Sequence, residues 1–68
     1  MQDWQQRVVT EKEELDDKII RLYIFIQASS ATINAPDLII LEEQWEVMLR
    51  YSNILNRRML TFKKENDD

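Results

Sequence analysis

Carboxylates are the most numerous side chains in this sequence that could do chemistry. They gather over residues 11–17 and again over residues 42–46. A di-metal carboxylate site in a helical bundle needs Glu-x-x-His motifs at inward positions, and this chain has no histidine. We therefore expect no metal site. The acids are interpreted as a solvated surface with ion pairs such as Glu14–Lys18 and Glu46–Arg50.

Other routes to catalysis are also missing. The serines have no histidine that could act as a general base, and the chain has no cysteine. Glycine is absent as well, which excludes Gly-rich phosphate loops and dinucleotide fingerprints. We therefore expect a protein that is not an enzyme and that uses no cofactor.

Basic residues and one tryptophan form a more informative group. Arginine clamps phosphate through a planar fork, and an aromatic ring can stack on a base, so together they suit a compact anionic ligand. Trp4 lies at the start of the chain. The basic residues are Arg7 near the start and Arg57, Arg58, Lys63 and Lys64 near the end. The alternative is that these charges complement helix dipoles and that Trp4 anchors an apolar seam.

Two long helices must position these side chains. Apolar residues at steps of three and four predict a helix over residues 3–28, with Asp3 as its N-cap. Small and hydroxyl residues predict a connection over 29–35, with Asn34 or Ala35 capping the next helix. A second helix is predicted over 36–64. A short connection makes the helices antiparallel, so the expected fold is all-α, a single two-helix hairpin over residues 1–68.

Each predicted helix has one apolar seam. Lys12 interrupts the first seam, and we expect its methylenes to lie along the seam with its charge in water. The first seam contains Trp4, Val8, Leu15, Ile19, Leu22 and Ile26. The second contains Leu38, Leu41, Trp45, Met48, Ser52, Leu55, Met59 and Phe62.

Many apolar residues lie outside both seams. An isolated hairpin cannot bury them, and a chain of 68 residues has a thin core on its own. We therefore expect the hairpin to assemble into a helical-bundle oligomer, at least a dimer. The residues outside the seams are Val9, Ile20, Tyr23, Ile24, Phe25, Ile39, Ile40, Val47, Leu49, Ile54 and Leu60.

Charge and hydropathy exclude some partners. The formal net charge of −4 argues against broad nucleic-acid binding, so no DNA partner is expected. The longest apolar run, over residues 22–26, is far too short to span a membrane. With no signal-peptide pattern at the N-terminus, we expect a soluble intracellular protein.

The sequence resembles a family of phage proteins. The first helix carries the resemblance in Gln6-Arg7-Val8-Val9, in residues 11–19 (EKEELDDKI) and in Phe25-Ile26. The second helix carries it in Gln44, Met48 and residues 51–58 (YSNILNRR). These segments are similar to the helical hairpin of phage anti-CBASS and anti-Thoeris signal sponges. The resemblance covers roughly residues 4–62.

This resemblance implies a function. Such sponges are not enzymes. They sequester the cyclic di- or trinucleotide messengers of bacterial anti-phage defence in the cytoplasm of the infected host. Relatives in the anti-CBASS branch form hexamers with pockets between protomers, so a hexamer is implied here. By position, the implied ligand-binding residues are Trp4, Lys18 and either Arg57 or Arg58, with Arg7 added because it lies at the same end of the hairpin. The link after Phe25-Ile26, usually aromatic in relatives, is polar here, so the ligand preference would differ.

Two other functions remain open. One is a small oligomeric protein-interaction module that docks on a partner helix. The other is a small RNA-binding bundle, which the net acidity of the chain disfavours. Titration with cyclic nucleotides would separate the sponge from the interaction module.

Overall fold

Two long α-helices make up the part of the chain that the structure describes. The structure is a computed structural model; it describes residues 2–66, with side chains for residues 2–62. Helix α1 spans Asp3–Ser29 and helix α2 spans Ala35–Asn66, slightly longer than the predicted ranges 3–28 and 36–64. No strand is present within residues 2–66, which confirms an all-α protein. Residues 1, 67 and 68 of the predicted hairpin lie outside the described range.

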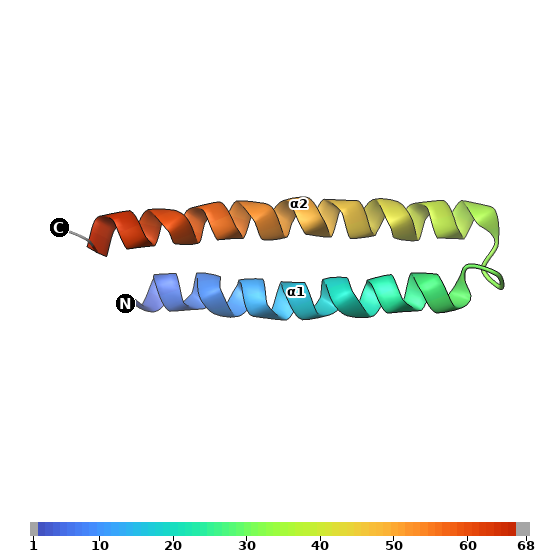
Figure 1. The fold of residues 1–68 in the computed structure, drawn as a ribbon, viewed down its shortest axis with the longest axis horizontal. Helices are drawn as coiled ribbons and strands as arrows, with labels where there is room; N and C mark the ends of the chain where they lie inside the picture. Colours follow the sequence, from blue (N-terminus) through green and yellow to red (C-terminus); the bar gives the residue numbers. More distant parts are fainter. Residues whose placement is uncertain (1, 67–68) are drawn as a thin grey trace.

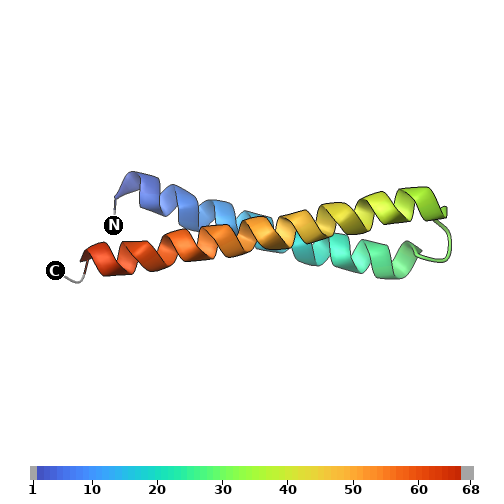
Figure 2. The ribbon, with the colours of Figure 1, turned by 90° about the horizontal axis from the view of Figure 1, so that it is seen from above.

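The helices lie side by side and antiparallel (Figure 1). The chain ends are therefore at one end of the molecule, and the connection is at the other. Figure 2 shows that the helices cross at a shallow angle near the middle of their length. The result is a rod about 53 Å long and 14 Å across.

The start of α1 differs from the prediction. Asp3 was expected to be the N-cap, but it is already helical, and Gln2 precedes the helix. The Gln5 side chain accepts a 2.9 Å hydrogen bond from the backbone N–H of Gln2. Gln5, at the third position of the helix, thus closes on the N–H of the N-cap residue as in a capping box, and Asp3 supplies negative charge to the positive end of the helix.

The connection ends one helix and begins the next. The backbone N–H groups of Thr32 and Ile33 both donate to the Ser29 carbonyl at 2.9 Å, which satisfies a carbonyl that the end of α1 leaves free. The Asn34 side-chain oxygen then accepts a 3.0 Å hydrogen bond from the backbone N–H of Asp37. Asn34 is thus the N-cap of α2, one of the two predicted candidates.

The core follows the two predicted seams with one correction. Leu55 is fully buried and packs with Val8 and Phe62, while Leu15 and Met59 cover this cluster. Trp4 was predicted to extend the first seam, but its side chain is 46% exposed, whereas Gln5 beside it is only 2% exposed. Gln5 can occupy the seam because its amide oxygen is already hydrogen-bonded to the backbone.

Large apolar side chains also remain exposed, as predicted for an isolated hairpin. They occupy both helices and are more extensive than the scattered surface residues of an ordinary monomer. The exposed residues are Trp4, Ile20, Tyr23, Ile24, Phe25, Ile39, Ile40, Val47, Leu49, Tyr51, Ile54 and Leu60. Neither described helix is long and apolar enough to cross a membrane.

Candidate functional site

Trp4 stands at the open end of the hairpin, where the chain begins and ends. Its ring meets the ring of Phe62 edge to face, with centroids 5.0 Å apart and planes at 88°. This contact packs the Trp4 ring against Phe62, a buried residue of the α2 seam. About half of the Trp4 side chain stays open to solvent. It therefore offers an anchored aromatic surface on which a planar ligand can stack.

The predicted arginines lie near the same end. Three contacts between the helices set their register: Trp4–Phe62, Asp16–Ser52 and Tyr23–Trp45. This register places the Arg57–Arg58 pair alongside residues 9–11 of α1, a turn beyond Arg7. All three arginines are exposed. The fold therefore brings Trp4, Arg7 and the arginine pair to the same end of the hairpin.

Lys18 is not part of this region. It is exposed on α1 and lies 14 residues after Trp4. At 1.5 Å per residue, this separates the two side chains by roughly 21 Å along the helix. One compact ligand cannot touch both on the same hairpin. A site containing both needs residues from a second copy of the chain.

Lys63 and Lys64 come after residue 62, the last residue whose side chain the structure describes. Their predicted place at the open end is therefore supported only by the backbone of α2, which includes both residues.

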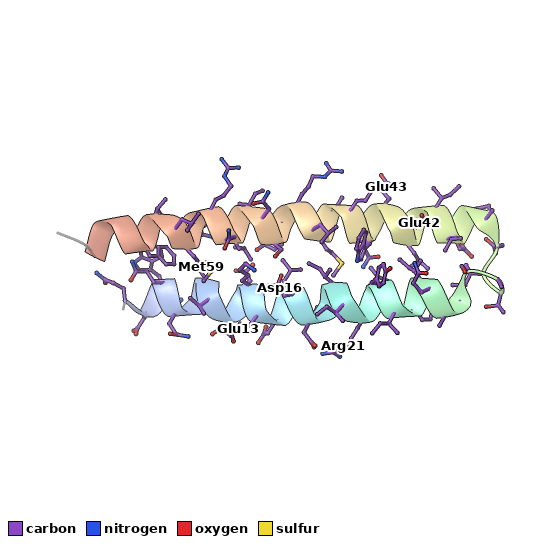
Figure 3. All side chains as sticks on the ribbon, viewed as in Figure 1. Glu13, Asp16, Arg21, Glu42, Glu43 and Met59 are labelled. Carbon is purple, nitrogen blue, oxygen red and sulfur yellow. The ribbon has the colours of Figure 1, made fainter. Side chains whose placement is uncertain are left out.

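A polar layer joins the two helices near the middle of their length, at the edge of the core, and it was not predicted. The Ser52 hydroxyl donates a 2.5 Å hydrogen bond to one oxygen of Asp16, and the Lys12 ammonium donates a 2.6 Å bond to the other. Figure 3 shows Asp16 between the two helices. The hydrogen bonds from Lys12 and Ser52 hold the pKa of Asp16 below its ordinary value.

This layer corrects the interpretation of Lys12. Its side chain does lie along the seam, but its charge is paired with Asp16 instead of being left in water. A signal was present in the sequence, because Lys12 and Ser52 are the polar exceptions in two otherwise apolar seams. Pairing these exceptions across an antiparallel hairpin would have placed them together.

The predicted surface ion pairs are also wrong in detail. Among the described side chains, the ion pairs are Lys12–Asp16 and Asp17–Arg21. The expected pairs Glu14–Lys18 and Glu46–Arg50 are not among them. Figure 3 shows Arg21 on the side of α1 that faces away from α2, so its pair with Asp17 is a surface contact.

An open groove of about 400 Å³ lies on α2, near the connection. It is lined by Ile39, Glu42, Glu43, Glu46 and Arg50, of which Figure 3 labels two. Three carboxylates against one arginine make the groove acidic, so it repels a phosphate. It does not suit the anionic ligand that the arginines at the open end suit.

The arrangement of the acidic side chains also bears on metal binding. Among the side chains of residues 2–62, no group of three or more acidic side chains is placed to hold a metal ion.

Comparison with known proteins identifies the family to which the chain belongs. The model of the family described as Sequestin matches residues 2–60, most of both helices and the connection. The chain belongs to the Sequestin family. All five candidate ligand residues lie inside the matched range. This confirms the resemblance to a sequestering anti-defence family. No curated protein and no solved structure matches the chain.

Proposed function

We propose that this Sequestin-family chain is a non-enzymatic sponge for the cyclic di- or trinucleotide messengers of bacterial anti-phage defence. It acts in the cytoplasm of the infected host and keeps the messenger from its effector. The observation that carries the proposal is the family match over residues 2–60 together with an exposed aromatic and arginine group at the open end of the hairpin.

The ligand-binding residues follow from charge and exposure. Arg7 and one arginine of the Arg57–Arg58 pair hold phosphate, while the open part of the Trp4 ring stacks on a base. Lys18 of a second copy completes the site, because it lies too far from Trp4 within one hairpin.

Self-association is part of the proposal. A single hairpin leaves its large apolar side chains exposed, and the groove on α2 is acidic. A closed oligomer, at least a dimer and up to a hexamer, buries the apolar side chains and forms pockets where hairpins meet. Light scattering measures the mass, and a single species at 8.3 kDa would contradict this part.

Calorimetric titration tests the binding. The full-length protein at micromolar concentration is titrated with a panel of cyclic di- and trinucleotides, with linear dinucleotides as the control. Binding of at least one cyclic member, and no binding of the linear ones, is expected. If the protein binds no member of the panel, the proposal that it sequesters cyclic nucleotides is wrong. The exposed apolar surface would then favour the interaction module, which a partner helix would cover.

Three variants test the residues. Lys18→Ala, Arg57→Ala and Arg58→Ala probe the proposed contacts, and Arg50→Ala is the matched control because Arg50 lines the acidic groove. Loss of one phosphate contact lowers the affinity about tenfold or more. If Lys18→Ala and Arg50→Ala bind equally well, Lys18 has no place in the site.

A further inference from the structure

A second apolar stripe runs along α2, directly beside the seam that packs on α1. It consists of Ile40, Gln44, Val47, Tyr51 and Ile54, each one residue before a seam residue. All five are exposed, and Val47 at the centre is 53% exposed. The steps of four and three match those of the buried seam, so this outer stripe has the spacing of a helix-packing surface.

The outer stripe carries no charged residue between its ends. Asp37 continues it at one end, and Arg58 continues it at the other. Neighbouring positions on a helix point about 100° apart. Helix α2 can therefore hold α1 with one seam and another helix with the outer stripe, as in a four-helix bundle.

Charge on α2 is divided at Val47. All acidic residues of residues 35–62 precede it and all basic residues follow it. The acids are Asp37, Glu42, Glu43 and Glu46, and the bases are Arg50, Arg57 and Arg58. Two copies of α2 packed in parallel would set like charges side by side. Two antiparallel copies set the acidic half of each against the basic half of the other.

The outer stripe fits that antiparallel arrangement. Ile40 and Ile54 each lie seven residues from Val47, on opposite sides. A two-fold axis through Val47 therefore pairs Ile40 of one copy with Ile54 of the other, and Val47 with itself. The same axis brings Asp37 of one copy beside the Arg57–Arg58 pair of the other.

We propose that two hairpins pair antiparallel through the outer stripe of each α2, about a two-fold axis at Val47. The partner is a second copy of this chain. Arg58, which continues the stripe, meets Asp37 of the second copy, and Arg57 stays available for an anion. The pairing rests on the self-association in the proposed function, and it defines which face is used and in which direction.

Cysteine cross-linking tests the pairing, because the chain contains no cysteine of its own. Full-length Val47→Cys should form a disulfide-linked dimer under mild oxidation at micromolar concentration, without nucleotide. A residue on the two-fold axis brings its own copies within disulfide reach. Ile24→Cys, equally exposed on α1, is the control and should cross-link at least about tenfold more slowly.

Two further variants test whether the two α2 helices pair antiparallel or parallel. Ile40→Cys alone should cross-link slowly, whereas a mixture of Ile40→Cys and Ile54→Cys, with a tag on one, should give the mixed dimer quickly. Rapid dimerisation of Ile40→Cys alone would indicate parallel pairing and overturn the proposal. Failure of Val47→Cys to exceed Ile24→Cys would overturn it as well.

Sedimentation gives a second measure of the same contact. Val47→Lys places two like charges across the two-fold axis and should weaken self-association about tenfold or more, whereas Gln27→Lys, at an exposed polar position of α1, should change it little. Equal effects of the two variants would contradict the pairing. Messenger binding is measured separately by calorimetry, so binding without cross-linking overturns the pairing alone, and cross-linking without binding overturns the sponge alone.

Discussion

Ser52 on α2 donates a hydrogen bond to Asp16 on α1 and thereby joins the two helices through the polar layer of the core. Asp16 also accepts the bond from Lys12, so one carboxylate holds partners on its own helix and on the other. An apolar seam can slip along its partner by a heptad with little loss of contact, but a paired carboxylate cannot. Together with the short connection, the layer therefore fixes the register that brings Trp4 to Phe62.

The Ser52 bond contributes measurable stability. Ser52→Ala should lower the free energy of unfolding by about 1 kcal/mol, because a hydrogen bond to a charged group is lost at a partly exposed site. Urea denaturation measures the change. Ser52→Thr keeps the hydroxyl and is the control. Equal stability of wild type and Ser52→Ala would show that the bond does not hold the helices together.

The stabilising contribution of the polar layer should decrease as the pH falls. The pKa of folded Asp16 is lowered from its ordinary value of 3.8 by its bonds from Lys12 and Ser52. The charged form is therefore stabilised by folding. Its contribution is present in full above the unfolded pKa and is lost as the pH falls through the lowered folded pKa.

The comparison with Asp16→Asn isolates this contribution. The difference in unfolding free energy between wild type and Asp16→Asn should be constant from pH 7 to about pH 5 and should shrink below pH 4. Glu13→Gln is the control, since Glu13 points away from α2 (Figure 3). A difference that stays constant to pH 2 would contradict the assignment.

Leu55 is the residue on which the core depends most. It is fully buried, so Leu55→Ala should destabilise the protein by about 2–5 kcal/mol, enough to unfold a hairpin of this size. Thr10→Ala, at an exposed position on α1, should change stability by less than about 0.5 kcal/mol. Thermal unfolding followed by circular dichroism measures both. A Leu55→Ala protein as stable as the control would mean that the seam is packed differently.

Trp4 should affect binding more than folding. Stacking of a base on an aromatic ring contributes about 1–3 kcal/mol, so Trp4→Ala should weaken messenger binding about 5- to 150-fold. Trp4→Phe keeps a ring and should retain most of the affinity. Calorimetry reads the affinity, and circular dichroism checks that the helices remain. If Trp4→Ala stays helical and binds the messenger as tightly as wild type, Trp4 is not a stacking surface.

Periodicity gave the two helices and nearly all of the core, because a seam is a local property that each helix carries by itself. Leu55 and Val8 were identified by spacing alone, and both are buried. Spacing also placed the Arg57–Arg58 pair at the open end, since a short connection leaves only one way to fold back.

Features that depend on side-chain bonding were missed. Gln5 was not predicted to be buried, because a polar residue enters a core only when its polar atoms are satisfied, and the bond to Gln2 is visible only in three dimensions. The bond between Asp16 and Ser52 needs the register between the helices. The apolar residues of the two seams repeat with the same period and do not specify that register; only the polar exceptions Lys12 and Ser52 mark it. The distance from Trp4 to Lys18 could have been predicted from the helical rise.

The division of charge along α2 also bears on the order in which the molecule folds. Asp37 in the first turn of α2 stabilises that helix by about 0.3–1 kcal/mol, and the charges further along it add less, because the effect fades beyond the terminal turns. Helix α1 likewise has an acid, Asp3, in its first turn, but it is shorter, with 27 residues against 32, and a longer helix forms more readily. We therefore expect α2 to gain structure first and α1 to dock on it late. Substitutions in the α1 half of the seam would then accelerate unfolding while leaving the rate of refolding nearly unchanged.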